Sequence, residues 1–415
     1  MSPSPSEQLA LRILRTLQSA GHTAYLAGGC VRDRLMSRPP KDFDVATSAR
    51  PDQVLALFPR SQQVGVAFGV ILVKQRIDNH LHQVEVATFR ADGHYSDGRH
   101  PDAVRFTTAE EDARRRDFTC NGLFFDPLAN NGAGQLHDFV GGQADIAAQT
   151  LRAIGNPHDR FAEDHLRMLR ALRFAARLQF SIHPDTHAAI ADLQPKIALI
   201  SRERIGEELR MMLEHPTRAA AAALLAAFPT LFHEALGFLP PNQSTTFPVL
   251  SNLPEKTTRT TALLALLLDS TPPPHAPLLP TLRARLMLSN DETAALAWLT
   301  EKLPRLDDWE DLSKAATKRL MAHRHWPDLD ALFRAIPDHA DQLLPFSERT
   351  ASLAEEGVAP PPFITGETLI RLGARPNPAF KSWLDALYDR QLNGELTNKD
   401  AALTAARQLL NRPPA

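Results

Sequence analysis

The spacing of apolar residues changes once along this chain, and that change limits the folds that it can adopt. Up to about residue 140, short runs of β-branched or alternating apolar residues are bounded by glycines and other turn residues, a pattern typical of strands. From about residue 144 onward, leucine and alanine recur three and four positions apart, which predicts helices. The sequence therefore predicts a head that mixes α and β elements, followed by helical modules.

The individual elements follow from the same patterns. We expect an opening helix over 7–20 and strands over 24–27, 43–46, 64–73 and 84–89. The strongest helical segments beyond the head are 163–180, 202–213 and 217–227. Because proline cannot continue a helix, its clusters mark linkers or sharp helix ends at 240–241, 272–274 and 360–362.

Composition narrows the class of protein. The chain has 415 residues, 43% of them hydrophobic and 23% charged, which suits several globular domains of roughly 100–200 residues each.

The sequence also bears on location and redox state. No apolar run approaches the roughly 20 residues that span a bilayer, and the first residues lack a signal-peptide pattern, so we expect a cytoplasmic protein with no membrane attachment. Cys30 and Cys120 are too few for a disulfide framework, which favours reduced packing residues. The net charge of −2 argues against a uniformly basic nucleic-acid coat but allows a local basic stripe.

Three acidic residues in the predicted strands are candidates for chemistry. Asp42 and Asp44 are two positions apart, and on a strand such residues project from the same face. A sheet that pairs this segment with the strand of Glu85 would bring three carboxylates together. Such hard oxygen ligands suit Mg²⁺, and a pair of these ions can stabilise both the attacking and the leaving oxygen of phosphoryl transfer. Taken alone, an Asp-x-Asp turn more often caps or solvates a strand end.

Two glycines between a predicted strand and a predicted helix are candidates for phosphate binding. Gly28 and Gly29 let the backbone approach phosphate oxygens closely, while the helix N-terminal amides and Arg32 supply positive potential. Such a turn is by itself more often structural. Followed about ten residues later by Asp42 and Asp44, it suggests a nucleoside triphosphate held against two metal ions.

These motifs form part of an ordered series. GGCVRD at 28–33 and DFD at 42–44 are followed by EVATFR at 85–90 and RRDFTCN at 115–121. The series continues through 138–145 and 152–174 to SRERIGEEL at 201–209. In this order, the segments resemble the motifs of class II tRNA nucleotidyltransferases and bacterial poly(A) polymerases, in the polymerase-beta superfamily. The resemblance covers about the first half of the chain.

The resemblance implies an α+β fold with a particular division into domains. A polymerase-beta-like nucleotidyltransferase head with a mixed or antiparallel sheet is expected at 1–142, and a helical neck with a nucleotide-selecting helix at 143–215. A helical body is expected at 216–335 and a helical, tRNA-binding tail at 336–415. The segment from 364–373 to 394–397 resembles the tail of CCA-adding enzymes, and the chain lacks the basic C-terminal extension of many poly(A) polymerases. Both features favour tRNA over messenger RNA ends.

The resemblance also implies how a nucleotide is chosen. Arg116, Asp117 and Asn121 match the motif that handles the ribose, and a carboxylate and an amide can both engage a 2′-hydroxyl. Without the resemblance, an Asp and an Asn could equally terminate a helix.

Base selection is expected at the start of the long helical run. Asp164 and Arg167 lie three positions apart and should share a helix face, where an acceptor and a donor together present a hydrogen-bonding edge to a base. The family uses the matching positions to select CTP and then ATP. We expect Arg170 to contact phosphate, whereas Arg173 and Arg177 fit a solvated face.

A polar, glycine-containing segment at 91–102 reads as a mobile loop. In CCA-adding relatives a loop at this place helps to convert the site from CTP to ATP, and enzymes that add only the two cytidines lack it. Its presence disfavours CC-only addition.

The sequence thus predicts a template-independent nucleotidyltransferase that adds CCA from CTP and ATP to the 3′ end of tRNA, whose acceptor arm it binds. Asp42 and Asp44 would hold Mg²⁺, Glu85 would complete the catalytic acids, and Gly28 and Gly29 would position the triphosphate together with Arg32. An enzyme that adds only the terminal A, a poly(A) polymerase, and a catalytically inert RNA-binding scaffold remain alternatives. Oligomeric state is not indicated.

Overall fold

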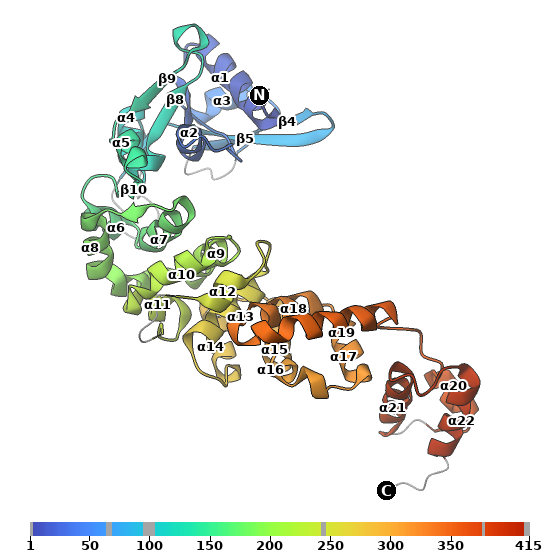
Figure 1. The fold of residues 1–415 in the computed structure, drawn as a ribbon. Coiled ribbons are helices and arrows are strands. Elements are labelled where there is room, and N and C mark those ends of the chain that lie inside the picture. Colours follow the sequence, from blue (N-terminus) through green and yellow to red (C-terminus); the bar gives the residue numbers. More distant parts are fainter. Residues whose placement is uncertain (1–2, 64–68, 94–103, 242–245, 376–377, 411–415) are drawn as a thin grey trace. The chain divides into compact units, whose positions relative to one another are not determined.

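The computed structural model describes residues 3–63, 69–93, 104–241, 246–375 and 378–410. The chain divides into two compact units, one of Met1–Pro240 with Ala284–Met287 and one of Pro241–Arg283 with Leu288–Ala415 (Figure 1). The boundary near residue 240 falls at the first proline cluster. The other two clusters follow the ends of helices, as predicted. Most of the expected loop at 91–102 lies outside the described residues.

A seven-stranded sheet forms the N-terminal part of the first unit (Figure 1). Its strands, in spatial order, are β3 (Gln62–Gln63), β4 (Val70–Ile77), β5 (His80–Thr88), β2 (Asp44–Thr47), β1 (Ala24–Ala27), β8 (Leu123–Asp126) and β9 (Gln135–Asp138). β2 and β5 are parallel and the other neighbouring pairs are antiparallel, so the prediction of a mixed sheet is confirmed. Two further pairs, β6 (Arg90–Asp92) with β7 (Val104–Phe106) and β10 (Thr150–Leu151) with β11 (Ser181–Ile182), form small separate sheets.

The predicted strands are found with small shifts. Strand 24–27 is confirmed, the second strand begins at Asp44 instead of residue 43, and β5 starts four residues before the predicted 84. β4 begins at Val70, and residues 64–68 of the predicted strand are not described. The turn between β4 and β5 carries Asp78 at φ 49° and Asn79 at φ 63°, the two positive φ values that a tight hairpin turn requires.

The two faces of the sheet have different neighbours. Helix α1 (Pro5–Ser19) packs on one face, where Leu9 and Ile13, one helical turn apart, join Val45 and Val86 in a single buried cluster. Ala46 belongs to a second cluster. Because successive strand residues point to opposite faces, Asp44 shares the face of Ala46 and points away from α1.

The remaining helices of the first unit lie either between the strands of the sheet in the chain or after them, and the later ones pack mainly on one another. They are α2 (Gly29–Leu35), α3 (Pro51–Leu57), α4 (Ala109–Arg114), α5 (Gly142–Ala147), α6 (Pro157–Glu163), α7 (Leu166–Leu178), α8 (Pro184–Leu193), α9 (Arg202–Leu213), α10 (Arg218–Ala226) and α11 (Pro229–Leu236). The helices predicted at 202–213 and 217–227 are confirmed. The helix predicted over 163–180 is found as α7, but it begins only at Leu166, because Asp164 has extended backbone angles of φ −153° and ψ 103° and separates α6 from α7.

The described part of the second unit is helical. It contains α12 (Pro248–Asn252), α13 (Arg259–Ser270), α14 (Leu279–Leu286), α15 (Asn290–Lys302), α16 (Pro304–Asp307), α17 (Lys314–Met321), α18 (Trp326–Ala335), α19 (Leu343–Glu355), α20 (Gly366–Arg371), α21 (Phe380–Leu392) and α22 (Lys399–Leu410); α14 crosses the boundary between the two units. The last three helices share a separate apolar cluster that includes Leu369, Leu387 and Ala402.

Within the described ranges, no single helix is both long and apolar enough to cross a bilayer. One bent pair, α10 with α11, is long and apolar enough only when its two helices are taken together, by length and composition alone.

Candidate active site

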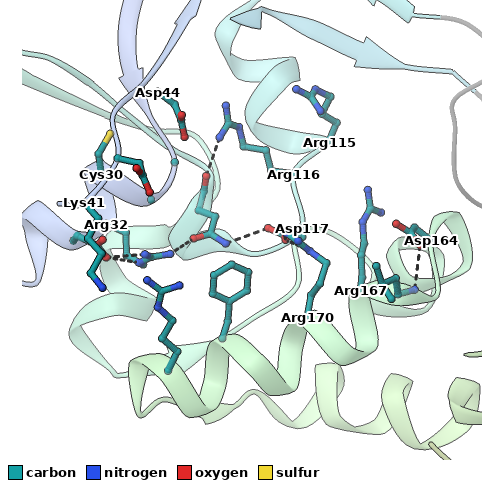
Figure 2. Close-up of a pocket in the computed structure, with 18 of the residues that line it drawn as sticks. Cys30, Arg32, Lys41, Asp44, Arg115, Arg116, Asp117, Asp164, Arg167 and Arg170 are labelled. Atoms are coloured by element: carbon teal, nitrogen blue, oxygen red, sulfur yellow. Dashed lines mark hydrogen bonds and ion pairs between the residues drawn. The ribbon is translucent and has the colours of Figure 1, made fainter. Parts of the chain in front are cut away.

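A cavity of about 550 Å³ opens in the first unit (Figure 2). It is lined by the end of β1 with the start of α2, the start of β2, the segment after α4, the start and one face of α7, and one residue of α9. Eleven of the twelve predicted site residues line it: Gly28, Gly29, Arg32, Asp42, Asp44, Arg116, Asp117, Asn121, Asp164, Arg167 and Arg170. Glu85 does not. Residues that were not predicted as site residues also line it, among them Lys41, Arg115, Phe174, Arg177 and Arg204.

The sheet register brings two of the three predicted acids together. Asp44 is the residue opposite Glu85 in the parallel pairing of β2 with β5, so both side chains leave the same face. Asp42 precedes β2, so the expectation that a shared strand aligns it with Asp44 is wrong, although Asp42 lines the same cavity. Desolvation and the charges of Glu85 and Asp42 together raise the pKa of Asp44 to about 6, although the charge of Arg116 acts in the opposite direction.

These carboxylates suit a divalent cation. Within the described ranges, no three His, Cys, Asp or Glu side chains are arranged as a complete ligand set. Mg²⁺ commonly takes only one or two protein carboxylates and completes its shell with water and substrate phosphate oxygens. Two acids beside a cavity, with a third raising the pKa of one of them, therefore fit such an ion, because the ion would relieve their mutual repulsion.

The glycine turn follows the C-terminal end of β1 and leads into α2. Gly28 has φ 70°, and a Cβ atom there would stand 3.1 Å from Nη1 of Arg116, so both the backbone and the space favour glycine. Arg32, which is only 5% exposed, donates to Asn121 Oδ1 at 2.6 Å and to Asp33 Oδ1 at 2.7 Å. The guanidinium of Arg32 thus links the turn to the next group of site residues.

That group is centred on Asp117. Its Oδ1 accepts from the backbone N–H of Phe118 at 2.8 Å and from Nδ2 of Asn121 at 3.2 Å, while its Oδ2 accepts from Nη2 of Arg170 at 2.7 Å. Burial alone would raise the pKa of Asp117, but Arg170 and Asn121 hold it below its usual value. Arg116 donates to Asp112 and to the carbonyl oxygen of Asn121. The predicted ribose residues therefore form one connected network.

Glu208 of α9 extends this network to α7. Its Oε2 accepts from Arg173 at 2.6 Å and its Oε1 from Arg170 at 3.4 Å. Glu208 and Arg173 are 3% and 8% exposed, so the expectation that Arg173 lies on a solvated face is wrong. Arg177, half-buried, lines the cavity instead of a solvated face. The periodic arginine pattern of α7 did not reveal these partners, because they lie more than thirty positions away along the chain.

The predicted base-selecting residues both line the cavity, but not on one helix face. Asp164 stands in the break before α7, where its Oδ1 accepts from the backbone N–H of Leu166 at 3.1 Å. Arg167 lies in the first turn of α7 and donates to the Glu163 carboxylate and, at 2.8 Å, to the carbonyl oxygen of Arg160. The Asp164 side chain therefore enters the cavity from extended backbone, and that of Arg167 from helical backbone.

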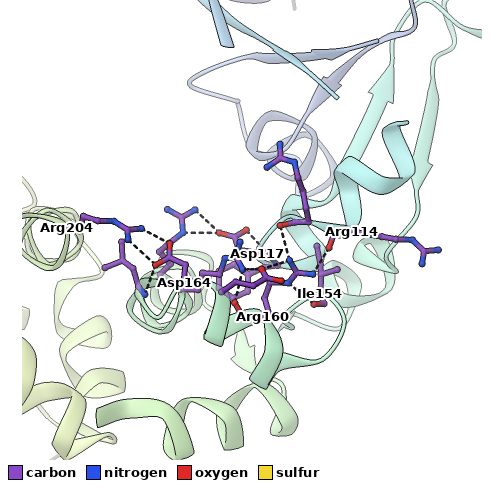
Figure 3. Close-up of polar contacts among 12 residues, drawn as sticks. Arg114, Asp117, Ile154, Arg160, Asp164 and Arg204 are labelled. Atoms are coloured by element: carbon purple, nitrogen blue, oxygen red, sulfur yellow. Dashed lines mark hydrogen bonds and ion pairs between the residues drawn. The ribbon is translucent and has the colours of Figure 1, made fainter. Parts of the chain in front are cut away.

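Asp164 also has a partner that sequence reasoning missed. Nη2 of Arg204, on α9, lies 2.6 Å from Oδ2 of Asp164 (Figure 3). Arg204 belongs to the last segment of the motif series, and that membership was the one signal that could have pointed to it.

The two cysteines are packing residues, as predicted. Both are buried and free, and burial raises the pKa of Cys30 to about 11 and that of Cys120 to about 12. Neither thiol is therefore a ready nucleophile.

Two family models match the chain. One is described as the poly A polymerase head domain and matches residues 24–152, and the other as the probable RNA and SrmB-binding site of polymerase A and matches residues 179–231. Together with the carboxylate-lined cavity at the edge of a mixed sheet, they define a nucleotidyltransferase of the polymerase-head class.

Curated relatives and solved structures narrow the class. The CCA-adding enzyme of Enterococcus faecalis is 44% identical over 205 residues, which is 49% of this chain and 48% of that enzyme, so the chain aligns with about half the length of this relative. The CCA-adding enzyme of Geobacillus kaustophilus is 33% identical over 98% of both chains. A crystal structure of the Bacillus stearothermophilus CCA-adding enzyme in complex with CTP superimposes with a TM-score of 0.79 at 28% identity, covering 98% of this chain and 99% of that one. The chain belongs to the family of CCA-adding enzymes, which are tRNA nucleotidyltransferases, and this family generally uses divalent metal ions.

Proposed function

We propose that this protein adds C, C and A to the 3′ end of tRNA from CTP and ATP, with release of pyrophosphate. The observation that carries the proposal is one cavity lined by Asp42 and Asp44 on the sheet side and by Asp164 and Arg167 on the helical side. It has acids for phosphoryl transfer and a donor–acceptor pair for reading a base, in a chain that aligns along its whole length with a CCA-adding enzyme.

In this reaction the 3′-hydroxyl of the tRNA attacks the α-phosphorus of the bound nucleotide, a new phosphodiester bond forms, and pyrophosphate leaves. Asp42 and Asp44 would hold Mg²⁺, which when bound stabilises charge on the attacking and leaving oxygens. Glu85 does not line the cavity, so we assign it to the support of Asp44, whose charge it influences from the neighbouring strand.

The triphosphate and the ribose are assigned to the centre of the cavity. Gly28 and Gly29 leave room for phosphate oxygens close to the backbone, and Arg32 adds positive charge beside them. Asp117 and Asn121 offer an acceptor and an amide to the 2′-hydroxyl of a ribonucleotide.

Arg116 and Arg170 complete the set of proposed nucleotide contacts. Both are held by carboxylates, Arg116 by the buried Asp112 and Arg170 by Asp117 of the cavity lining. Their guanidinium groups are therefore already held in place before a nucleotide binds, which reduces the conformational entropy lost on binding.

Base selection is assigned to Asp164 and Arg167. Cytosine and adenine both carry an exocyclic amino group that donates, whereas uracil and guanine carry a carbonyl oxygen at the corresponding position. A carboxylate only accepts and a guanidinium only donates, so the pair matches the amino group and the adjacent ring nitrogen of C and A. One fixed pair can therefore serve both CTP and ATP and reject UTP and GTP.

The proposed domains follow the order of the family. A nucleotidyltransferase head at 1–142 and a neck at 143–215 form the site, while a body at 216–335 and a tail at 336–415 hold the acceptor arm of tRNA. The alignment with a CCA-adding enzyme over 98% of both chains supports tRNA as the substrate, and with it a place of action in the cytoplasm.

Two alternatives share the site. An enzyme that adds only the terminal A, or a poly(A) polymerase, would use the same residues, and a family model is described by the latter activity. An inert RNA-binding scaffold is disfavoured, because clustered acids that face a polyanion are costly unless cations neutralise them.

One experiment separates these functions. Purified protein is given tRNA that ends at its discriminator base, or tRNA that ends in CC, with CTP alone, ATP alone or both. Extension of the first tRNA by three nucleotides when both are present is the expected result. Extension of only the second tRNA by one A indicates A addition, a long A tract indicates poly(A) polymerase, and no incorporation contradicts the proposal.

A further inference from the structure

Arg204, on helix α9, donates two hydrogen bonds to the carboxylate of Asp164. Its Nη1 and Nη2 donate to Oδ1 and Oδ2 at 3.2 and 2.6 Å, the parallel arrangement of two planar groups (Figure 3). The side chains of Arg204 and Asp164 are 22% and 14% exposed, so the pair is partly shielded from water and lines the cavity. This geometry makes it stronger and more directional than a surface ion pair.

The backbone of Asp164 does not impose this orientation. Because the residue stands between two helices in an extended conformation, its short side chain is not packed against a helical turn of its own. The backbone N–H of Leu166 donates to Oδ1 alone. Arg204 contacts both oxygens, through Nη1 to Oδ1 and Nη2 to Oδ2, and so fixes the plane of the carboxylate.

The plane of that carboxylate matters for the proposed reading of bases. An oxygen aligned with the amino group of C or A gains a hydrogen bond, whereas the same oxygen facing the carbonyl of U or G meets another acceptor. A carboxylate that turns freely loses the hydrogen bond to the amino group of C or A, and it can also turn away from the carbonyl oxygen of U or G. Discrimination therefore depends on orientation as well as on charge.

We propose that Arg204 is a positioning residue for nucleotide selection, which it exerts by holding Asp164; the inference rests on the proposed CCA-adding function. Arg204 belongs to α9, inside the segment 179–231 that matches the RNA-binding family model and outside the polymerase head. Base selection at the cavity is thus set in part by a helix beyond the catalytic sheet.

The test compares three variants. Arg204→Gln removes the charge and the fork, and Arg204→Lys keeps the charge but offers a point contact in place of two parallel bonds. Arg210→Gln is the matched control, because Arg210 lies on the same helix, pairs with Glu207 of that helix and with Glu214 just after its end, and does not line the cavity. For each protein, kcat/KM is measured for CTP and UTP on tRNA that ends at the discriminator base, and for ATP and GTP on tRNA that ends in CC.

We expect Arg204→Gln to lower the CTP/UTP and ATP/GTP ratios about tenfold or more, the scale at which a two-point contact discriminates between bases. Arg204→Lys should lie between this variant and the wild type, and Arg210→Gln should match the wild type. A general folding defect lowers kcat/KM for all four nucleotides alike and leaves both ratios unchanged. If Arg204→Gln does not fold, Arg204→Lys alone decides.

A second measurement separates positioning from an independent effect. In an Asp164→Asn background there is no carboxylate to orient, so adding Arg204→Gln should leave the ratios where Asp164→Asn put them. Wild-type ratios in Arg204→Gln and Arg204→Lys, or fully additive losses in the double variant, overturn the inference. A wild-type protein that incorporates neither CTP nor ATP contradicts the proposed function instead, which is a different result.

Discussion

Replacing Glu208 by glutamine tests the ion-pair network that joins α7 to α9. Glu208 is 3% exposed and balances Arg173, which is 8% exposed, at 2.6 Å. Glutamine keeps the shape and one acceptor oxygen but removes the charge. The guanidinium of Arg173 then remains buried over the ring of Phe174 without its carboxylate.

The magnitude follows from the burial of both partners. Removal of one partner of a buried pair costs about 3–5 kcal/mol, and the acceptor that glutamine retains places the expected loss near the lower end, at about 3 kcal/mol. For a folding unit of roughly 150–250 residues, each kcal/mol lowers the Tm by about 2–4 °C, so the first unit should melt about 6–12 °C earlier.

Thermal unfolding followed by circular dichroism measures the change, with Glu207→Gln as the control. Glu207 is the preceding residue, its side chain is 54% exposed, and it pairs with Arg210 on its own helix. A surface pair of this kind contributes about 0–1 kcal/mol, so the control should shift the Tm by only a few degrees.

A further variant identifies the cause of the loss. Glu208→Leu combined with Arg173→Leu removes both charges and should recover most of the stability, because neither residue is then left uncompensated. Equal melting of Glu208→Gln and Glu207→Gln would refute the argument that the buried pair holds the two helices together.

Three more predictions concern the site and its support. Asp42→Ala should abolish incorporation of labelled CTP while tRNA binding in a filter assay persists, and unchanged incorporation would remove Asp42 from the proposed catalytic acids. Gly28→Ala should destabilise the protein by about 1–3 kcal/mol in urea unfolding, since φ 70° with ψ −127° is a conformation that residues with a Cβ atom rarely adopt, and weaken nucleotide binding as the new Cβ meets Arg116. Burial would raise the pKa of Asp138, but hydrogen bonds from four backbone N–H groups hold this pKa below its ordinary value. The ionised Asp138 carboxylate therefore stabilises the fold above about pH 4, the ordinary pKa of an unfolded Asp, and this stabilisation is lost as the pH falls through the lower pKa of the folded state. Urea unfolding should accordingly show Asp138→Asn less stable than the wild type at pH 7 and the difference shrinking as the pH falls below 4; a difference as large at pH 2 as at pH 7 would contradict this.

Much of the fold could be predicted from local patterns. The strand at 24–27, the helix at 202–213 and the glycine turn at Gly28 follow from alternation, helical spacing and the need for a positive φ, each of which acts within a few residues. The break at Asp164 could not be predicted in this way, because the apolar spacing of α6 and α7 continues across it.

The sequence by itself determined the succession of strands and helices and the types of residue available for chemistry, because both are carried by short segments. Only the tertiary structure decided which side chains meet: Asp44 faces Glu85 through the register of two parallel strands, and Asp164 is held by Arg204 from a helix forty residues away. Charged side chains pair through space once the elements are packed, and their spacing along the chain carries no record of those partners. The arginines of α7 therefore look alike in the sequence, although one is buried against Glu208 and another lines the cavity.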